Sequence, residues 1–103
     1  MIKPKIKQVI VDGEIYDRVF YHTGMDVDKI IEALQQIKND FPGSRIASDG
    51  KGGDIQVPRF SELLIASGES HGAVTGFTVD VSRKGYGGFI RIHGPTYSWR
   101  DDC

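Results

Sequence analysis

Residues 5–21 read KIKQVIVDGEIYDRVFY, and this stretch decides the fold. Two runs rich in Ile, Val, Tyr and Phe flank the pair Asp12-Gly13. A two-residue Asp-Gly loop favours the type I′ turn of a β-hairpin, because that turn needs positive φ at both central residues. The stretch therefore predicts two antiparallel strands, at residues 5–11 and 14–21, joined by a tight turn.

The turn also predicts the register of the hairpin, since loop length sets which residues lie opposite one another. Val11 should lie opposite Glu14, and Lys7 opposite Arg18. One face would then carry four apolar residues, which we interpret as core: Ile6, Ile10, Ile15 and Val19. The other face would mix basic and aromatic residues with one valine: Lys5, Lys7, Val9, Tyr16, Arg18 and Phe20.

Residues 26–40 have the apolar spacing of an amphipathic helix. The stripe at i, i+3, i+4, i+7 and i+10 consists of Val27, Ile30, Ile31, Leu34 and Ile37. Thr23 with Asp26 three residues later resembles a capping box, and the Phe-Pro-Gly of residues 41–43 ends the helix. We expect this helix to cover one face of a sheet and its stripe to be the main contribution to the core.

The rest of the chain alternates between short strands and glycine-rich loops. Residues 45–48 favour a short strand, residues 49–54 a loop, and residues 58–67 either a short helix or a buried strand. Residues 77–82 alternate apolar and polar, which predicts a half-buried strand, and residues 89–93 return as its hairpin partner. Residues 96–103 are expected to form a tail.

The predicted fold is a single α+β domain over residues 1–103. It has an antiparallel sheet of four or five strands with one main amphipathic helix packed on one face. A second short helix is present if residues 58–67 are helical.

Composition restricts the function classes. The 103 residues carry 13 basic and 14 acidic side chains, a formal charge of −1, so no global field favours nucleic acid or a membrane surface. No apolar run approaches the ~20 residues that cross a bilayer. The one cysteine, Cys103, excludes a disulfide framework. We expect a cytoplasmic protein without a membrane partner.

The basic and aromatic face of the hairpin is the first candidate site. Like charges directly opposite, here Lys7 and Arg18, destabilise a hairpin mildly unless an anion lies between them. We expect no acidic neighbour on that face. Cations interleaved with aromatic rings also suit a base or a phosphate. A solvated face whose long side chains cover the rings is the simpler alternative.

The second candidate is the glycine-rich segment around residue 85. Lys84-Gly85-Tyr86-Gly87 followed by Phe89-Ile90 resembles the RNP1 element of RRM domains, which implies nucleic-acid binding. Gly88 is an extra residue relative to that pattern, and one insertion moves every later side chain of a strand to the other face. We therefore interpret the segment as a hairpin turn that is basic, and turn geometry alone is the preferred explanation of its glycines. The alternative is a concave anion site, which successive glycine N–H groups can make with Arg83, Lys84 and Arg91.

Metal and catalytic patterns are weak. His22, His71 and His93 lack the spacing of a helical zinc site, and the loop at residues 49–54 lacks the alternating oxygen ligands of an EF-hand. We expect no metal and no cofactor. No nucleophile or acid–base constellation is visible, so enzyme status stays uncertain, with a non-enzymatic role favoured.

The sequence thus favours a small non-enzymatic protein that sequesters or senses an anionic, nucleotide-like or phosphate-bearing ligand. The candidate ligand-binding residues are Lys5, Lys7, Tyr16, Arg18, Phe20, Arg83, Lys84, Gly85, Tyr86, Gly87 and Arg91. The alternative is a protein-interaction module or inhibitor of the phage or mobile-element type that binds a protein partner. A nucleic-acid-binding domain ranks third. The mixed apolar and basic sheet face also favours a homo-oligomer.

Overall fold

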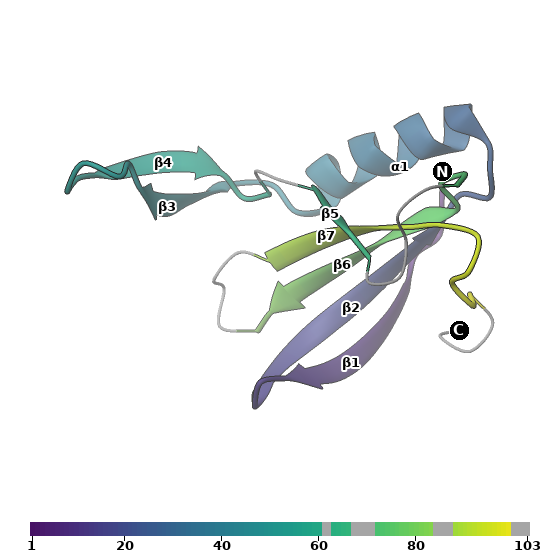
Figure 1. Ribbon diagram of the computed structural model, residues 1–103, viewed down its shortest axis with the longest axis horizontal. Coiled ribbons are helices and arrows are strands. Elements are labelled where there is room, and N and C mark those ends of the chain that lie inside the picture. The colour runs from purple at the N-terminus through teal and green to yellow at the C-terminus, as the bar shows by residue number, and fades with distance from the viewer. Residues whose placement is uncertain (61–62, 67–71, 84–87, 100–103) are drawn as a thin grey trace.

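The structure is a computed structural model, described here for residues 1–60, 63–66, 72–83 and 88–99. Its elements in chain order are β1 (Lys5–Val11), β2 (Glu14–His22), α1 (Val27–Asp40), β3 (Ser44–Ser48), β4 (Asp54–Pro58), β5 (Leu63–Ile65), β6 (Gly76–Ser82) and β7 (Gly88–His93). Helix α1 lies over one face of a sheet, and β3 and β4 project from the body as a separate arm (Figure 1).

The main sheet has the strand order β1-β2-β6-β7-β5. The α+β prediction with one helix packed on a sheet is confirmed. The sheet is mixed and not wholly antiparallel, because β5 runs parallel to β7. For residues 58–67, which we left open between helix and strand, the described part contains strand β5. Strand β4, which the sequence analysis did not predict, pairs with β3 in a two-stranded sheet of its own.

The first hairpin forms as predicted. Asp12 and Gly13 have φ values of 51° and 80°, which is the backbone that a type I′ turn requires. The register places Val11 opposite Glu14 and Lys7 opposite Arg18. The local turn chemistry was therefore sufficient to define every pair in this hairpin.

Helix α1 begins at Val27, three residues later than a capping box with Thr23 as the N-cap would place it. Asp26 is itself the N-cap, and its Oδ1 accepts from the backbone N–H groups of Asp28 and Lys29 at 2.9 and 3.3 Å. The Thr23 hydroxyl donates to the carbonyl of Gly24 instead. The helix ends at Asp40, and Gly43 follows in a left-handed conformation with φ of 106°.

The core lies between α1 and the middle strands of the sheet. Its buried members are Val19, Tyr21, Ala33, Ile37, Phe77, Val79 and Ile90. Burial raises the pKa of the Tyr21 hydroxyl well above its usual value, and the hydrogen bond that it donates to Asp40 adds to this shift. Tyr21 therefore stays a neutral donor that ties β2 to the end of α1.

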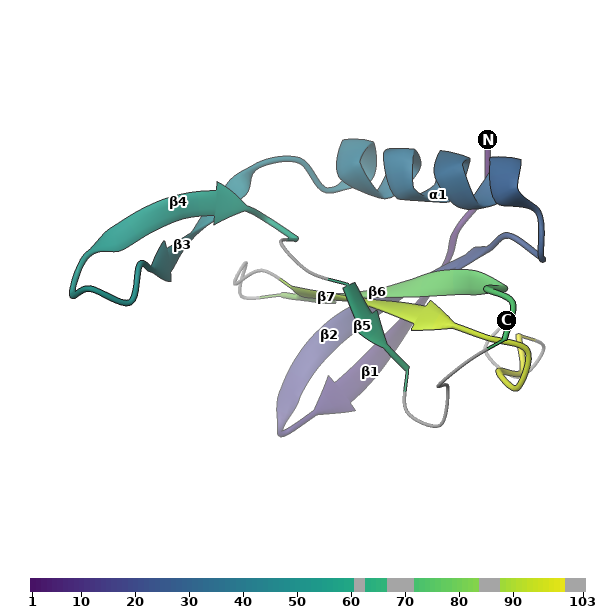
Figure 2. The ribbon, with the colours of Figure 1, turned by 45° about the horizontal axis from the view of Figure 1, so that its top comes forward.

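Two parts of the predicted core are exposed. Ile6, Ile10 and Ile15 lie on the helix side of the hairpin as expected, but they are 68%, 71% and 41% exposed. The reason is visible in Figure 2, where the β1–β2 hairpin runs beyond the end of the layer that α1 covers. Within α1 the buried stripe is centred on Ala33 and Ile37, and Ile31 is 60% exposed.

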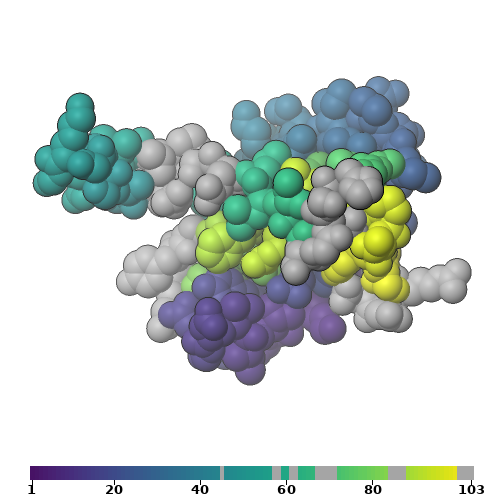
Figure 3. Space-filling model, in the orientation of Figure 1, coloured from purple at the N-terminus to yellow at the C-terminus, as the bar shows by residue number. Residues whose placement is uncertain are grey.

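The arm formed by β3 and β4 stands clear of the rest of the molecule in the space-filling view (Figure 3). Its turn is held by Asp49, whose Oδ1 accepts from the N–H groups of Lys51 and Gly53 at 2.6 and 3.1 Å. The arm exposes Ile46 and Ile55, at 65% and 46%. An apolar side chain on each strand is therefore left in solvent.

The end of the chain is packed as far as it is described. The Tyr97 ring stacks on His93 with centroids 3.9 Å apart, and the Trp99 ring stacks on His22 at 4.8 Å. Trp99 also donates to the Thr75 hydroxyl at 3.1 Å. A Cβ at Gly76 would lie 2.5 Å from the Trp99 ring, so only glycine permits this contact. Residues 97–99 of the expected tail thus cover one end of the sheet face that lies away from α1.

Candidate anion-binding face

We call the sheet face away from α1 the back face. Two rows of cross-strand neighbours run across it. The first row is Lys7, Arg18, Asp80 and Phe89, and the second is Lys5, Phe20, Thr78 and Arg91. Because side chains alternate along each strand, all eight project to the same side of the sheet.

Asp80 is the centre of these rows. Its side chain is 2% exposed, and Arg18 binds it with both Nε and Nη2, at 2.7 and 3.0 Å. Arg91 donates from Nη1 to the second carboxylate oxygen at 2.7 Å. The expectation that Arg18 has no acidic neighbour on this face was therefore wrong. The Asp12-Gly13 turn predicts that Arg18 lies opposite Lys7, but it does not predict which strand lies on the other side of Arg18.

The two rows contain more basic than acidic side chains. Among the residues that the structure describes in these two rows, four basic side chains accompany the single carboxylate of Asp80. The side chains of Arg18 and Arg91 keep 29% and 33% of their surface in solvent. Lys5 and Lys7 on the neighbouring strand are exposed. We call these four residues with Asp80 the basic cluster.

The aromatic residues on this face differ in accessibility. Phe20 was a candidate ligand-binding residue, but it is only 3% exposed, so its ring is not accessible for stacking on a ligand. Tyr16 is half-buried at the turn end of the hairpin, where its hydroxyl donates to Glu14 at 3.4 Å. Phe89 is 42% exposed, and the Arg91 guanidinium lies 5.7 Å from its ring centroid. Phe89 is therefore the ring that a ligand at Arg91 could reach.

The second predicted feature does not join this cluster. Arg83 pairs with Asp17 at 3.0 Å and also donates to the Gln8 side chain. Both partners lie on the helix side of the sheet, which is the opposite face. Lys84, Gly85, Tyr86 and Gly87 lie outside the described residues. Of the predicted glycine-loop donors, Arg91 is the one that the structure places beside Arg18.

Sequence reasoning missed Asp80 and Phe89 as members of the site. A signal for Asp80 was present, because a charged residue in the middle of an otherwise Val- and Phe-rich strand is costly to bury without a partner. The alternation in that strand did indicate which face Asp80 occupies. Only the pairing of β2 with β6 shows that its partner is Arg18.

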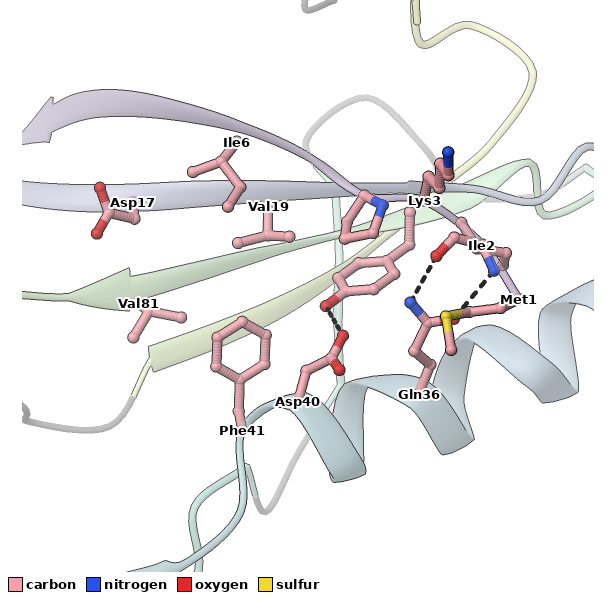
Figure 4. A pocket seen from close by; sticks show the side chains of 12 residues that line it. Met1, Ile2, Lys3, Ile6, Asp17, Val19, Gln36, Asp40, Phe41 and Val81 are labelled. Carbon is pink, nitrogen blue, oxygen red and sulfur yellow. Dashed lines mark hydrogen bonds between the residues drawn. The ribbon is translucent and has the colours of Figure 1, made fainter.

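Two hollows lie on the other side of the sheet. A groove of about 620 Å³ runs between α1 and the first hairpin, and Figure 4 shows its walls, including Ile6, Val19 and Phe41. The Ile2 backbone closes one end through two hydrogen bonds with the Gln36 amide. A second pocket of about 540 Å³ lies between the end of α1 and β5, with Phe41, Phe60 and Leu63 in its lining. Both hollows are mainly apolar, in contrast to the back face.

We also searched the described residues for metal sites and membrane-spanning helices. Within residues 1–60, 63–66, 72–83 and 88–99, no three His, Cys, Asp or Glu side chains gather as a metal site would require. No helix in this part of the chain has the length and apolar character to span a membrane.

Comparison with known proteins found no match to this chain. Neither a protein-family model, nor a curated protein, nor a solved structure matches it.

Proposed function

We propose that this protein binds a small phosphate-bearing anion at the basic cluster of the back face. The observation that carries the proposal is the pair of guanidinium groups bound to one carboxylate, Asp80. One cation is enough to neutralise a buried aspartate. The second arginine exceeds what the neutralisation of Asp80 needs, and Lys5 and Lys7 add two exposed basic side chains on the neighbouring strand.

The geometry suits an anion because the arginines are already oriented. Arginine normally loses side-chain entropy when it is fixed on a ligand, and a guanidinium held in place beforehand avoids much of that cost. Asp80 binds Arg91 through Nη1, so the Nε and Nη2 groups of Arg91 take no part in that ion pair. Arginine N–H groups match phosphate oxygens in spacing and charge. In this proposal Asp80 is a positioning residue and the basic side chains contact the ligand.

The test compares two double variants that change charge equally. Lys5→Gln/Lys7→Gln removes two cations beside Arg18 on the back face. Lys29→Gln/Lys38→Gln removes two exposed cations from α1, on the other side of the sheet. Titration calorimetry and thermal shift with inorganic phosphate, ATP and a short oligonucleotide would measure binding to each protein.

We expect at least one of these anions to bind the parent protein and to bind more weakly as salt rises. The back-face variant should weaken binding about tenfold or more, since two charge-assisted contacts contribute roughly 1.4 kcal/mol or more together. The helix variant should leave the affinity within about twofold of the parent. If no anion binds, or if both variants weaken binding equally, the basic cluster is not the site. Binding of the oligonucleotide alone would favour the nucleic-acid reading.

The arm supports a second candidate function, a protein-interaction module. A lone two-stranded sheet is marginal in water, and this one exposes Ile46 and Ile55 on its strands. Binding through such apolar side chains persists at high salt, whereas anion binding does not. This function would be favoured if a partner protein binds at high salt, if Ile46→Ser/Ile55→Ser abolishes that binding, and if none of the tested anions binds.

A further inference from the structure

We propose that two copies of this chain pair through their β1 strands, antiparallel and about a two-fold axis at Gln8, so that their two main sheets become one continuous sheet. The proposal concerns the sheet edge and does not depend on anion binding. It begins from the position of β1, which is the outer strand at one end of the main sheet.

The backbone groups on the open edge follow from the turn. Val11 and Glu14 flank a two-residue turn and therefore form a hydrogen-bonded pair. In an antiparallel ladder the direction of the backbone groups alternates from residue to residue. The N–H and C=O groups of Lys7 and Val9 thus face β2, and those of Ile6, Gln8 and Ile10 face outward.

An observed bond on the far side of β2 agrees with this alternation. Ile15 lies opposite Ile10, and its carbonyl accepts from the Arg83 N–H on the β6 side at 3.4 Å, away from β1. The backbone groups of three alternate residues on β1, Ile6, Gln8 and Ile10, can therefore form hydrogen bonds with another strand. An open edge of this kind is a template for pairing.

The side chains on this edge add an apolar component. Ile6 and Ile10 are 68% and 71% exposed on the helix side of the hairpin. Proteins commonly protect an open edge with charges, and β1 does carry Lys5 and Lys7, but these project to the back face. On the helix side, the residue of β1 between the two isoleucines is Gln8. Its side-chain oxygen accepts a hydrogen bond from Arg83.

The occupant is a second copy because this strand is complementary to itself. A two-fold axis at Gln8 is the register that pairs all seven residues of β1. It places Ile6 opposite Ile10 of the second copy, Lys7 opposite Val9, and Lys5 opposite Val11, so no like charges meet. Moving the axis to Lys7 would place Lys7 opposite itself, and moving it to Ile6 would place Lys5 opposite Lys7, which is unfavourable.

The same register makes the apolar rows continuous. Within one copy Ile6 lies opposite Val19 and Ile10 opposite Ile15. Pairing Ile6 with Ile10 of the second copy extends each row to four apolar residues across the interface. The outward groups at Ile6, Gln8 and Ile10 would form about six hydrogen bonds between the copies. Backbone pairing and apolar contact therefore select the same register.

The test uses two variants at Gln8. Gln8→Pro removes the outward N–H without breaking a bond to β2, and proline is tolerated on an edge strand. Gln8→Ala removes the same side chain, with its contact to Arg83, and keeps the N–H. Analytical ultracentrifugation should give twice the 11.4 kDa chain mass for the parent and for Gln8→Ala, and the single chain mass for Gln8→Pro. A parent that stays monomeric up to about 1 mM, a dimeric Gln8→Pro, or a monomeric Gln8→Ala would overturn the proposal.

Hydrogen exchange on the unmodified protein gives an answer even if Gln8→Pro does not fold. The amides of Ile6, Gln8 and Ile10 should be protected at high concentration and should exchange faster on dilution. The amides of Lys7 and Val9, which bond to β2, should keep their protection at both concentrations. Rapid exchange at residues 6, 8 and 10 at every concentration would refute the pairing.

Discussion

Replacing Asp80 by Asn keeps the shape of the side chain and removes the charge that holds Arg18 and Arg91. Asp80 accepts three charge-assisted hydrogen bonds, at 2.7, 3.0 and 2.7 Å. Such bonds contribute about 1.5–3 kcal/mol each, and removing one partner of a buried ion pair typically costs about 3–5 kcal/mol. The arginine side chains are 29% and 33% exposed, so water recovers part of this loss, and the amide oxygen still accepts from one of them. We expect Asp80→Asn to lower the free energy of unfolding by about 2–4 kcal/mol.

Urea denaturation followed by circular dichroism would measure this change, and the melting temperature should fall on the order of 10–20 °C. Asp17→Asn is the matched control. It makes the same chemical change in the Asp17–Arg83 pair, whose side chains are 38% and 52% exposed. An exposed pair contributes about 0–1 kcal/mol, so the control should be nearly neutral. An Asp80→Asn variant as stable as the parent, or a control that loses as much, would refute the view that Asp80 organises the back face.

Two further predictions test the core and the turn. Ile37→Ala should lower the free energy of unfolding by about 2–5 kcal/mol, because Ile37 is 1% exposed, whereas Ile31→Ala at a 60% exposed position should cost under about 1 kcal/mol. Equal urea midpoints for these two variants would contradict the observed stripe. Gly13→Val forces a β-branched residue to φ of 80° and should cost about 1–3 kcal/mol, although a Cβ at this position would meet no atom within 4 Å. A melting temperature unchanged in Gly13→Val would mean that the turn is not type I′.

The local elements were readable from the sequence because their causes lie within a few residues. The Asp12-Gly13 pair adopts positive φ, and this turn sets every pair of the first hairpin. The apolar spacing of residues 26–40 gave the helix, observed as Val27–Asp40, to within one residue at its start. The alternation in β6 indicated which of its residues share a face. Each of these inferences needed only residues within one short stretch of the sequence.

The candidate site depends on contacts between distant segments, and the sequence did not contain them in readable form. Arg18 and Asp80 are 62 positions apart, and they meet only because β6 pairs with β2. Arg83 is paired with Asp17 on the opposite face, so it is separated from Arg91, with which it was grouped on the basis of the sequence. Ile6 and Ile10 have the pattern of core residues but lie beyond the reach of α1. Whether an apolar face is covered depends on where the helix ends relative to the strands, and this is a property of the assembled layers that periodicity along one strand does not record.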